Sequence, residues 1–367
     1  MVMEQQQQQQ QPGVARVQDV VSTFRPCRLF KAPPPSSYTS IDFDDSGEFL
    51  LLSRSDDTVQ LFNVKAGQHA KELKSQKYGS TLARFTHHST SIIYASTKYN
   101  DDIRYLSMHD NSYIRYFKGH TARVTSVNLS PNNDQFMSAS IDNTVKLWDA
   151  RSPNAQGQLN FESPWLTAYD ASASVIAIAS PPSQTIALYD LRNYDRPPFA
   201  TFDLLDVEKQ FKSQGQRPGE GWLGMEFSNN GKYMIISTNG PGHYILDAFS
   251  GDLLHYLQKP TGADYSHYAP GADLSTVPSG QGSTPSFIQS SACFSPDGRY
   301  VIGGNGRQPN LQVWDCAEEA KLDRVLEPCA ELPSQKPAKV VAYNPRHNLL
   351  ATADKEMMMW LPDPDSA

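Results

Sequence analysis

The sequence predicts an all-β protein in which seven similar units close into a ring, a β-propeller. Three observations lead to this fold class. Only 19% of the 367 residues are charged, while 22 are glycine and 26 are proline, a composition that favours short strands joined by turns. A unit of strands and polar turns recurs along the chain. A strand-like segment also precedes the first unit, and a ring needs such a segment to cover its last edge strand.

The head of the chain has two predicted parts. Residues 1–18 contain the glutamine run Gln5–Gln11 and no apolar signal core, so we expect a disordered tail, most simply one without a function. The segment Phe24–Phe30 has strand character. We expect it to form the outer strand of the seventh unit and to pair with Met357–Trp360, so that the two chain ends hold one ring together.

Each unit ends its third strand with an aromatic residue or an apolar replacement. Most intervals between these anchor residues lie close to the ~40–45 residues typical of propeller repeats. The two intervals on either side of Leu246 are longer, because they contain inserted segments. The seven anchors are Phe62, Leu106, Trp148, Tyr189, Leu246, Trp314 and Trp360.

Polar turns recur at matching offsets after the first strand of several units. Asp44–Gly47 and Ser295–Gly298 are examples, built from residues that tolerate positive φ in hairpin turns. Apolar runs such as Tyr233–Ser237 follow these turns, as expected for strands that neighbouring units cover on both faces. We therefore expect one ring domain over residues 19–363, followed by a short tail, 364–367.

The two insertions fall at residues 203–221 and at about 260–285. The second is rich in Gly, Ser, Pro, Tyr and Ala and nearly devoid of aliphatic residues, so it cannot bury enough apolar surface to fold alone. We expect both insertions to be surface loops. The simplest interpretation is that they elaborate the ring without adding a function.

One unit is nearly complete and identifies the repeat. A Gly-His pair ending at His120, a turn aspartate at Asp142 and a Trp-Asp pair beginning at Trp148 form the WD40 signature. His120, Ser140 and Asp142 also include the residue types of a Ser-His-Asp triad. We favour a structural tetrad of these three residues with Trp148, in which buried polar groups satisfy one another. No Gly-x-Ser-x-Gly elbow supports a nucleophile, so we expect no enzyme activity.

Composition and spacing argue against several other functions. The net charge of −7 and the pI near 5.7 disfavour direct DNA binding. No apolar run approaches the ~18 residues of a membrane span. The four cysteines lack zinc-ligand spacing and we expect them to be reduced thiols, so no metal is expected. They are Cys27, Cys293, Cys316 and Cys329. Glycine-rich phosphate-binding loops are also absent, so no cofactor is expected.

The expected docking face is the rim where the chain enters each first strand and turns before each third strand. Arginine and aromatic residues on such a rim are the types that form interface hot spots. Simple packing or solvation is the alternative role for each candidate. The candidate partner-binding residues are Lys77, Tyr78, Arg123, Asp142 and Trp222.

A second functional interpretation comes from two consecutive repeat endings. Trp148–Arg151 and Tyr189–Arg192 both follow the pattern aromatic-Asp-x-Arg. In some WD40 proteins this ending docks the adaptor of a cullin–RING ubiquitin ligase, so a substrate receptor of such a ligase is the alternative function. The motif is short, and each arginine has a simpler interpretation as a partner for a carboxylate of a neighbouring blade.

Longer strings outside the standard repeat are more specific. They lie in one order across six repeats, and the last is followed by the ending Trp360–Pro362. The strings are Lys77–Gly79, Asp102–Asn111, Tyr113–Phe117, Trp148–Asn154, Tyr189–Arg192, Pro198–Phe202, Phe227–Gly231 and Ile236–Gly240. From about residue 20 to 363 the chain thereby resembles one family. It is the WD-repeat subunit shared by COMPASS-type histone methyltransferase complexes and a cleavage/polyadenylation-linked type-1 phosphatase complex.

The resemblance implies a nuclear, non-catalytic scaffold. In COMPASS-type complexes such a subunit binds the N-terminal region of the SET-domain methyltransferase, which modifies lysine 4 of histone H3. In the other assembly it binds a regulatory subunit of the phosphatase and acts at transcription termination. Family members are also linked to the phosphorylated RNA polymerase II tail. The glutamine-rich head and the two longer loops depart from the family pattern and leave open any contacts they make.

Overall fold

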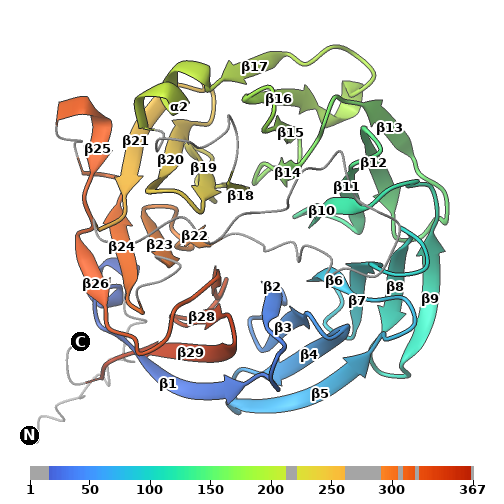
Figure 1. The fold of residues 1–367 in the computed structure, drawn as a ribbon, viewed down its shortest axis with the longest axis horizontal. Helices are drawn as coiled ribbons and strands as arrows, with labels where there is room; N and C mark the ends of the chain where they lie inside the picture. Colours follow the sequence, from blue (N-terminus) through green and yellow to red (C-terminus); the bar gives the residue numbers. More distant parts are fainter. Residues whose placement is uncertain (1–15, 212–220, 261–290, 305–308, 319–321, 365–367) are drawn as a thin grey trace, which may run out of the picture.

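A computed structural model describes residues 16–211, 221–260, 291–304, 309–318 and 322–364. Within these ranges the strands form seven sheets arranged around a central axis (Figure 1). The predicted all-β, seven-bladed propeller is therefore confirmed. In each blade the strands run from an innermost strand near the axis to an outermost strand at the circumference.

Blades 1 to 4 each contain four consecutive strands. Blade 1 contains β2 (Tyr38–Phe43), β3 (Phe49–Arg54), β4 (Thr58–Asn63) and β5 (Gln68–Lys74). Blade 2 contains β6 (Thr81–Phe85), β7 (Ser91–Ala95), β8 (Ile103–Ser107) and β9 (Ser112–Phe117). Blade 3 contains β10 (Val124–Leu129), β11 (Gln135–Ser140), β12 (Thr144–Asp149) and β13 (Gly157–Asn160). Blade 4 contains β14 (Leu166–Tyr169), β15 (Val175–Ser180), β16 (Thr185–Asp190) and β17 (Ala200–Asp203).

Blades 5 to 7 depart from consecutive order. Blade 5 contains β18 (Trp222–Phe227), β19 (Tyr233–Thr238), β20 (Gly242–Asp247) and β21 (Leu253–Gln258), and β25 (Val325–Leu326) adds to β21 in parallel. Blade 6 contains β22 (Ala292–Phe294), β23 (Tyr300–Gly304), β24 (Leu311–Asp315) and β26 (Ala330–Leu332). Blade 7 contains β27 (Val340–Tyr343), β28 (Leu350–Ala353), β29 (Glu356–Pro362) and β1 (Phe24–Lys31). Within the described residues the short helices are α1 (Val17–Val20), α2 (Leu205–Phe211) and two 3₁₀ turns, Leu191–Asn193 and Leu322–Arg324.

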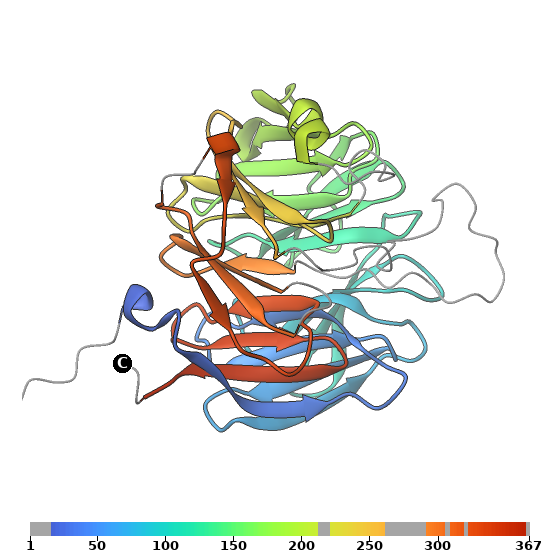
Figure 2. The ribbon, with the colours of Figure 1, turned by 60° about the vertical axis from the view of Figure 1, so that its left-hand side comes forward.

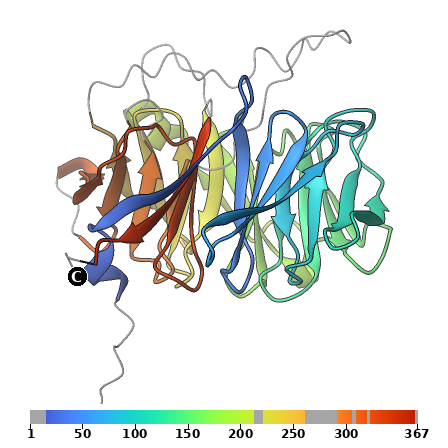
Figure 3. The ribbon, with the colours of Figure 1, turned by 90° about the horizontal axis from the view of Figure 1, so that it is seen from below.

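The first and last strands close the ring. β1 pairs antiparallel with β29, from Phe24 opposite Pro362 to Lys31 opposite Glu356. Figures 2 and 3 show the first strand (blue) beside the last (red). The predicted closure by an N-terminal strand in the seventh blade is confirmed. The pairing shifts register after Pro26, where proline has no N–H to donate.

The structure corrects the predicted boundary of the N-terminal tail. Residues 1–15 lie outside the described residues, but Val17 and Gln18 belong to helix α1. Val20 and Val21 follow with exposed fractions of 1% and 4%, and they pack with Phe24 into the core between blades 6 and 7. Val17 and Gln18 therefore do not belong to the tail, because the helix that contains them leads into valines that bury apolar surface in the core.

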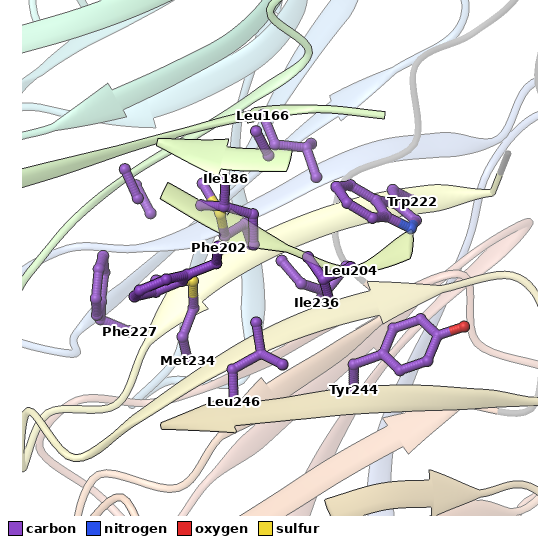
Figure 4. Packing of buried hydrophobic residues seen from close by; sticks show 14 of the residues in the cluster. Leu166, Ile186, Phe202, Leu204, Trp222, Phe227, Met234, Ile236, Tyr244 and Leu246 are labelled. Carbon is purple, nitrogen blue, oxygen red and sulfur yellow. The ribbon is translucent and has the colours of Figure 1, made fainter. Parts of the chain in front are cut away.

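The apolar core lies between adjacent blades. All seven predicted anchors lie on third strands and are buried, with Trp314 and Trp360 completely inaccessible. Figure 4 shows one interblade cluster, in which Phe202 of blade 4 packs among Met234 and Leu246 of blade 5. Each blade thus covers a face of the next, which explains why second and third strands are apolar on both faces.

Polar side chains on the innermost strands also join neighbouring blades. Asp42 in blade 1 accepts a hydrogen bond from the backbone N–H of Phe85 in blade 2 at 2.8 Å. The Asp42 carboxylate also forms an ion pair with Arg84 at 3.2 Å. Asn128 in blade 3 donates to the carbonyl oxygen of Thr167 in blade 4 at 2.5 Å. These contacts hold the innermost strands of neighbouring blades together and satisfy polar groups near the axis.

The first predicted surface loop, 203–221, contains a docked helix. On α2 the buried Glu208 carboxylate accepts hydrogen bonds from the indole N–H of Trp222 and the side-chain amide of Gln184, both at 2.5 Å. Phe211 stacks on Tyr256 with ring centroids 4.1 Å apart. The prediction of a loop was wrong for this part, because α2 packs onto blades 4 and 5. Residues 212–220 and 261–285 lie outside the described residues, as do 365–367 of the predicted C-terminal tail.

His87 lies in the turn between β6 and β7 and joins blades 1, 2 and 3 on the edge of the ring opposite α2. Its Nδ1 lies 2.6 Å from a carboxylate oxygen of Asp45 in blade 1, and its Nε2 lies 3.0 and 3.1 Å from the carbonyl oxygens of Ser130 and Asn133 in blade 3. All three partners are acceptors, so only the doubly protonated imidazolium satisfies them together. Although burial lowers the pKa of His87, these acceptors raise it above its usual value overall.

We expect the stabilising effect of His87 to depend on pH. Because its pKa is raised on folding, its contribution is complete below about 6.5, the usual histidine value, and is lost as the pH rises through the raised pKa. His87→Ala should therefore reduce the free energy of unfolding more at about pH 6 than at about pH 8.5, by on the order of 1 kcal/mol. Urea unfolding of both proteins at the two pH values measures this. An equal loss at both pH values would contradict the assignment.

Candidate functional site

A chain of buried hydrogen bonds occupies one end of blade 3. His120 Nδ1 lies 2.9 Å from the Asp142 carboxylate, and His120 Nε2 lies 2.7 Å from the Ser138 hydroxyl oxygen. The same hydroxyl oxygen accepts a hydrogen bond from the indole N–H of Trp148 at 2.8 Å. The serine of the tetrad is therefore Ser138, and the prediction of Ser140 was wrong.

The two serines differ in their level along β11. Both point to the same face because they are two residues apart. Ser138 lies two residues from Phe136, which is opposite Trp148, whereas Ser140 lies opposite Thr144 beside the turn. The Ser140 hydroxyl donates to the carbonyl oxygen of Ala122 at 2.7 Å and so secures the entering loop.

The tetrad has the connectivity of a catalytic triad but no access for a substrate. Ser138 is completely buried and the His120 side chain is 1% exposed. Burial lowers the pKa of His120, which keeps the ring neutral, with one nitrogen donating and the other accepting. The Ser138 hydroxyl is also held by Trp148. No reacting atom is able to approach the hydroxyl. The hydrogen bonds among the four groups therefore stabilise the blade.

Asp142 belongs to this bracing network and is not a free docking residue. Its side chain is only 5% exposed. Its carboxylate accepts from the backbone N–H of Thr121 at 3.0 Å and from the Thr144 hydroxyl at 2.6 Å, in addition to His120. Burial by itself raises the pKa of Asp142, but these hydrogen bonds lower it overall. The prediction of Asp142 as a partner-binding residue was wrong, since its acceptor capacity is used internally.

Trp222 is the second rim candidate that the structure corrects. It is 3% exposed and lies beneath α2, with its indole N–H bonded to Glu208. Its aromatic surface packs in the core between blades 4 and 5 (Figure 4). The sequence placed Trp222 at the correct loop entrance, but the inserted helix covers that position.

The other three rim candidates are at least partly accessible. Lys77 is exposed and Tyr78 is half-buried, both in the loop that enters blade 2. Arg123 is half-buried at the entrance of blade 3; burial lowers its pKa to about 10, while Asp101 of blade 2 acts in the opposite direction. The rim of blades 2 and 3 thus holds the residues that remain candidates for docking.

An aromatic and cationic cluster surrounds Tyr78. The guanidinium carbon of Arg104 lies 3.5 Å from the Tyr78 ring centre, 5.5 Å from that of Tyr113 and 5.0 Å from that of Tyr116. Tyr99, which is 85% exposed, contacts Tyr78 edge-on with ring centroids 6.2 Å apart. Sequence reasoning missed Arg104 as the centre of this cluster, although the tyrosine-rich strings around it were noted.

Hydrogen bonds hold the cluster rigid. Arg104 is 2% exposed, and its Nε donates to the Ser96 hydroxyl at 2.8 Å and one Nη to the Asn100 amide oxygen at 3.1 Å. Aromatic faces thus provide much of the surroundings of a buried cation. The Tyr113 hydroxyl lies 2.9 Å from that of Tyr94. Such rigidity lets a partner bind with little loss of receptor entropy.

A pocket of about 90 Å³ opens beside the cluster, between the outer strands of blades 1 and 2. Its apolar wall comes from Val59 and Leu73 of blade 1 and from Leu106 of blade 2. Tyr113 belongs to both the pocket and the cluster, so the two form one continuous surface. The remaining lining residues are Lys74, Ser75, Tyr94 and Asn111.

Comparison with known proteins places the chain in a family. Residues 111–149 match the family model "WD domain, G-beta repeat". The "Set1 complex component swd2" of Schizosaccharomyces pombe is 34% identical over 93% of this chain and 98% of its own length. The chain belongs to the Swd2 family of WD-repeat proteins. Two further relatives agree. "WD repeat-containing protein 82" of Drosophila melanogaster is 36% identical over 94% of this chain and 96% of its own. "COMPASS component SWD2" of Saccharomyces cerevisiae is 34% identical over 89% and 91%.

The aromatic-Asp-x-Arg endings of this Swd2-family chain do not show, among the described residues, the expected pairing of arginine with a carboxylate of a neighbouring blade. Arg151 pairs with Asp149 of its own ending at 2.7 Å, not with a carboxylate of a neighbouring blade. Asp190 caps the turn that follows it by accepting from the backbone N–H of Arg192 at 2.9 Å. In both endings the aspartate therefore organises its own turn, which supports a structural role for the motif.

Two further features are absent from the described ranges. Those residues contain no group of three or more His, Cys, Asp or Glu side chains arranged to hold a metal ion. No helix among them is long and apolar enough to span a membrane. The four cysteines are free thiols whose pKa values burial raises, which lowers their reactivity.

Proposed function

We propose that this Swd2-family chain is a non-catalytic scaffold subunit of a nuclear, COMPASS-type complex that methylates lysine 4 of histone H3. The observation that carries the proposal is similarity over nearly the full length to relatives named as components of the Set1 and COMPASS complexes. Burial of the triad-like set supports the absence of catalysis, because His120 and Ser138 are sealed inside blade 3.

The proposed role is to dock the N-terminal segment of the SET-domain methyltransferase on the rim of blades 2 and 3. Helix α2 covers the corresponding rim of blades 4 and 5, so a partner meets the accessible Lys77, Tyr78 and Arg123 elsewhere on the ring. The rigid frame supports docking of a short segment, because the receptor has little freedom to lose.

The sequence resemblance extends the proposal to a second assembly. There the chain docks a regulatory subunit of a type-1 phosphatase within the cleavage and polyadenylation machinery, and so supports transcription termination and contact with the phosphorylated RNA polymerase II tail. The strings such as Asp102–Asn111 support this assignment. The alternative, a cullin–RING substrate receptor, predicts recovery of a ligase adaptor that depends on Arg151 or Arg192.

Affinity purification of the tagged full chain from nuclear extract tests the proposal. We expect methyltransferase-complex or phosphatase-complex subunits to be recovered. Tyr78→Ala and Arg123→Ala should each reduce that recovery about fivefold to tenfold, as for moderate interface hot spots. Phe249→Ala is the matched control, because Phe249 is 91% exposed in a turn on the opposite edge of blade 5. Recovery of neither set of subunits would reject the proposal, and unchanged recovery with both rim variants would move the docking face elsewhere.

A further inference from the structure

The surface formed by the pocket and the aromatic cluster of blades 1 and 2 has an apolar centre. The pocket is lined by Val59, Leu73 and Leu106, and its volume of about 90 Å³ suits one apolar side chain rather than a whole ligand. The hydroxyl groups of Ser75 and Tyr94 lie 3.0 Å from each other and are hydrogen-bonded, so they do not require a polar partner from a bound side chain. The pocket therefore favours an apolar anchor.

The border of the pocket is cationic, although the whole chain has a net charge of −7. Lys74 lines the pocket and its side chain is 67% exposed. Lys77 lies over the Tyr78 ring at 5.0 Å and has no carboxylate within ion-pair distance among the described residues. Lys98 is half-exposed and pairs with Asp57. Glu72 is shared between Arg54 and Lys74, and Arg54 also pairs with Asp56.

We propose that this surface binds an extended acidic peptide segment, with one apolar side chain in the pocket and flanking Asp or Glu carboxylates on Lys74 and Lys77. The inference rests on the proposed docking function and names the chemistry of the docked segment. Charge complementarity favours an acidic occupant, because Lys77 has no ion-pair partner among the described residues and the exposed Lys74 shares its partner, Glu72, with Arg54.

The tyrosines give this binding mode its geometry. Tyr113 forms one side of the pocket, and Tyr78 carries the cation–π contacts of both Lys77 and Arg104. A peptide anchored in the pocket therefore runs along Tyr113 and Tyr78 toward the exposed ring of Tyr99. Rigid aromatic side chains beside a small pocket and a charged border are a common anatomy of hot spots.

A phage-displayed library of random dodecapeptides, selected on the full-length protein, tests the proposal without assuming a partner. We expect enriched peptides that contain one apolar residue flanked by Asp and Glu. Synthetic copies should bind Lys74→Glu and Lys77→Glu about tenfold more weakly than wild type, as measured by fluorescence polarisation. Replacing the apolar residue of the peptide by alanine should weaken binding similarly. Lys65→Glu is the matched control, since Lys65 is exposed in a turn of blade 1 on the opposite edge.

The outcomes separate this inference from the proposed function. Enriched peptides that are basic or neutral, that bind both lysine variants as tightly as wild type, or that are absent altogether would overturn it. Peptides that meet the expectation establish the surface even if nuclear extract yields no methyltransferase subunits, a result that would reject only the complex assignment. If nuclear extract yields the methyltransferase subunits but no acidic peptide is enriched, the complex assignment stands and its contact lies on another face.

Discussion

Deleting residues 16–31 is expected to destabilise the whole ring, because all seven blades depend on the pairing of β1 with β29. The deletion removes the buried side chains of Val20, Val21 and Phe24 from the core between blades 6 and 7. At about 1.5–3 kcal/mol for each buried apolar side chain, the loss is roughly 5 kcal/mol or more. It also exposes the edge of β29 as a site for aggregation. Thermal and urea unfolding of the shortened chain measure the effect.

Point variants on the same strand provide the control. Phe24 is 1% exposed and Phe24→Ala should cost about 3–5 kcal/mol, whereas Leu29 is 46% exposed and Leu29→Ala should cost less than about 1 kcal/mol. A shortened chain that melts at the wild-type temperature would show that closure does not depend on β1. Equal costs for the two point variants would show that burial of Phe24 is not the cause.

Replacing Ser138 by alanine is expected to cost about 2–4 kcal/mol, because it leaves both His120 Nε2 and the Trp148 indole N–H buried without their partner. Ser140→Ala should cost less, about 1–2 kcal/mol, since it removes two neutral hydrogen bonds at the edge of the blade, one to the Ala122 carbonyl and one from the backbone N–H of Asp142. The two substitutions are chemically identical and lie two residues apart on β11. Denaturant unfolding of each variant gives the comparison, and a larger cost for Ser140→Ala would refute the assignment of the tetrad.

The sequence predicted the ring but not every role within it. The spacing of the anchors correctly identified the third strand of all seven blades. Strand periodicity places each anchor on a face of its strand that packs between blades, so the pattern can be recognised in the sequence. The tetrad serine was missed for a related reason. Ser138 and Ser140 have the same periodicity, and only the reach of the Trp148 indole distinguishes them.

The candidate docking site was also predicted only in part from the sequence. Lys77, Tyr78 and Arg123 were predicted from loop position alone, and they are at least partly accessible in the structure. Trp222 was misplaced, because residues of an insertion fold back as α2 and cover it. Arg104 was not singled out, since a strand residue opposite Tyr116 becomes the centre of a cluster only when the loop carrying Tyr78 lies over it.

The sequence by itself determined three features: the number of blades, from residue types repeated at fixed spacing, the closing strand, from the strand-like segment before the first unit, and the family, from strings outside the standard repeat. Only the tertiary structure decided which serine bridges His120 and Trp148, which rim residues remain accessible, and where the pocket of blades 1 and 2 opens. The physical reason is that periodicity encodes which face a side chain occupies. Hydrogen-bond partners and accessible surface depend on distances between blades that no local pattern specifies.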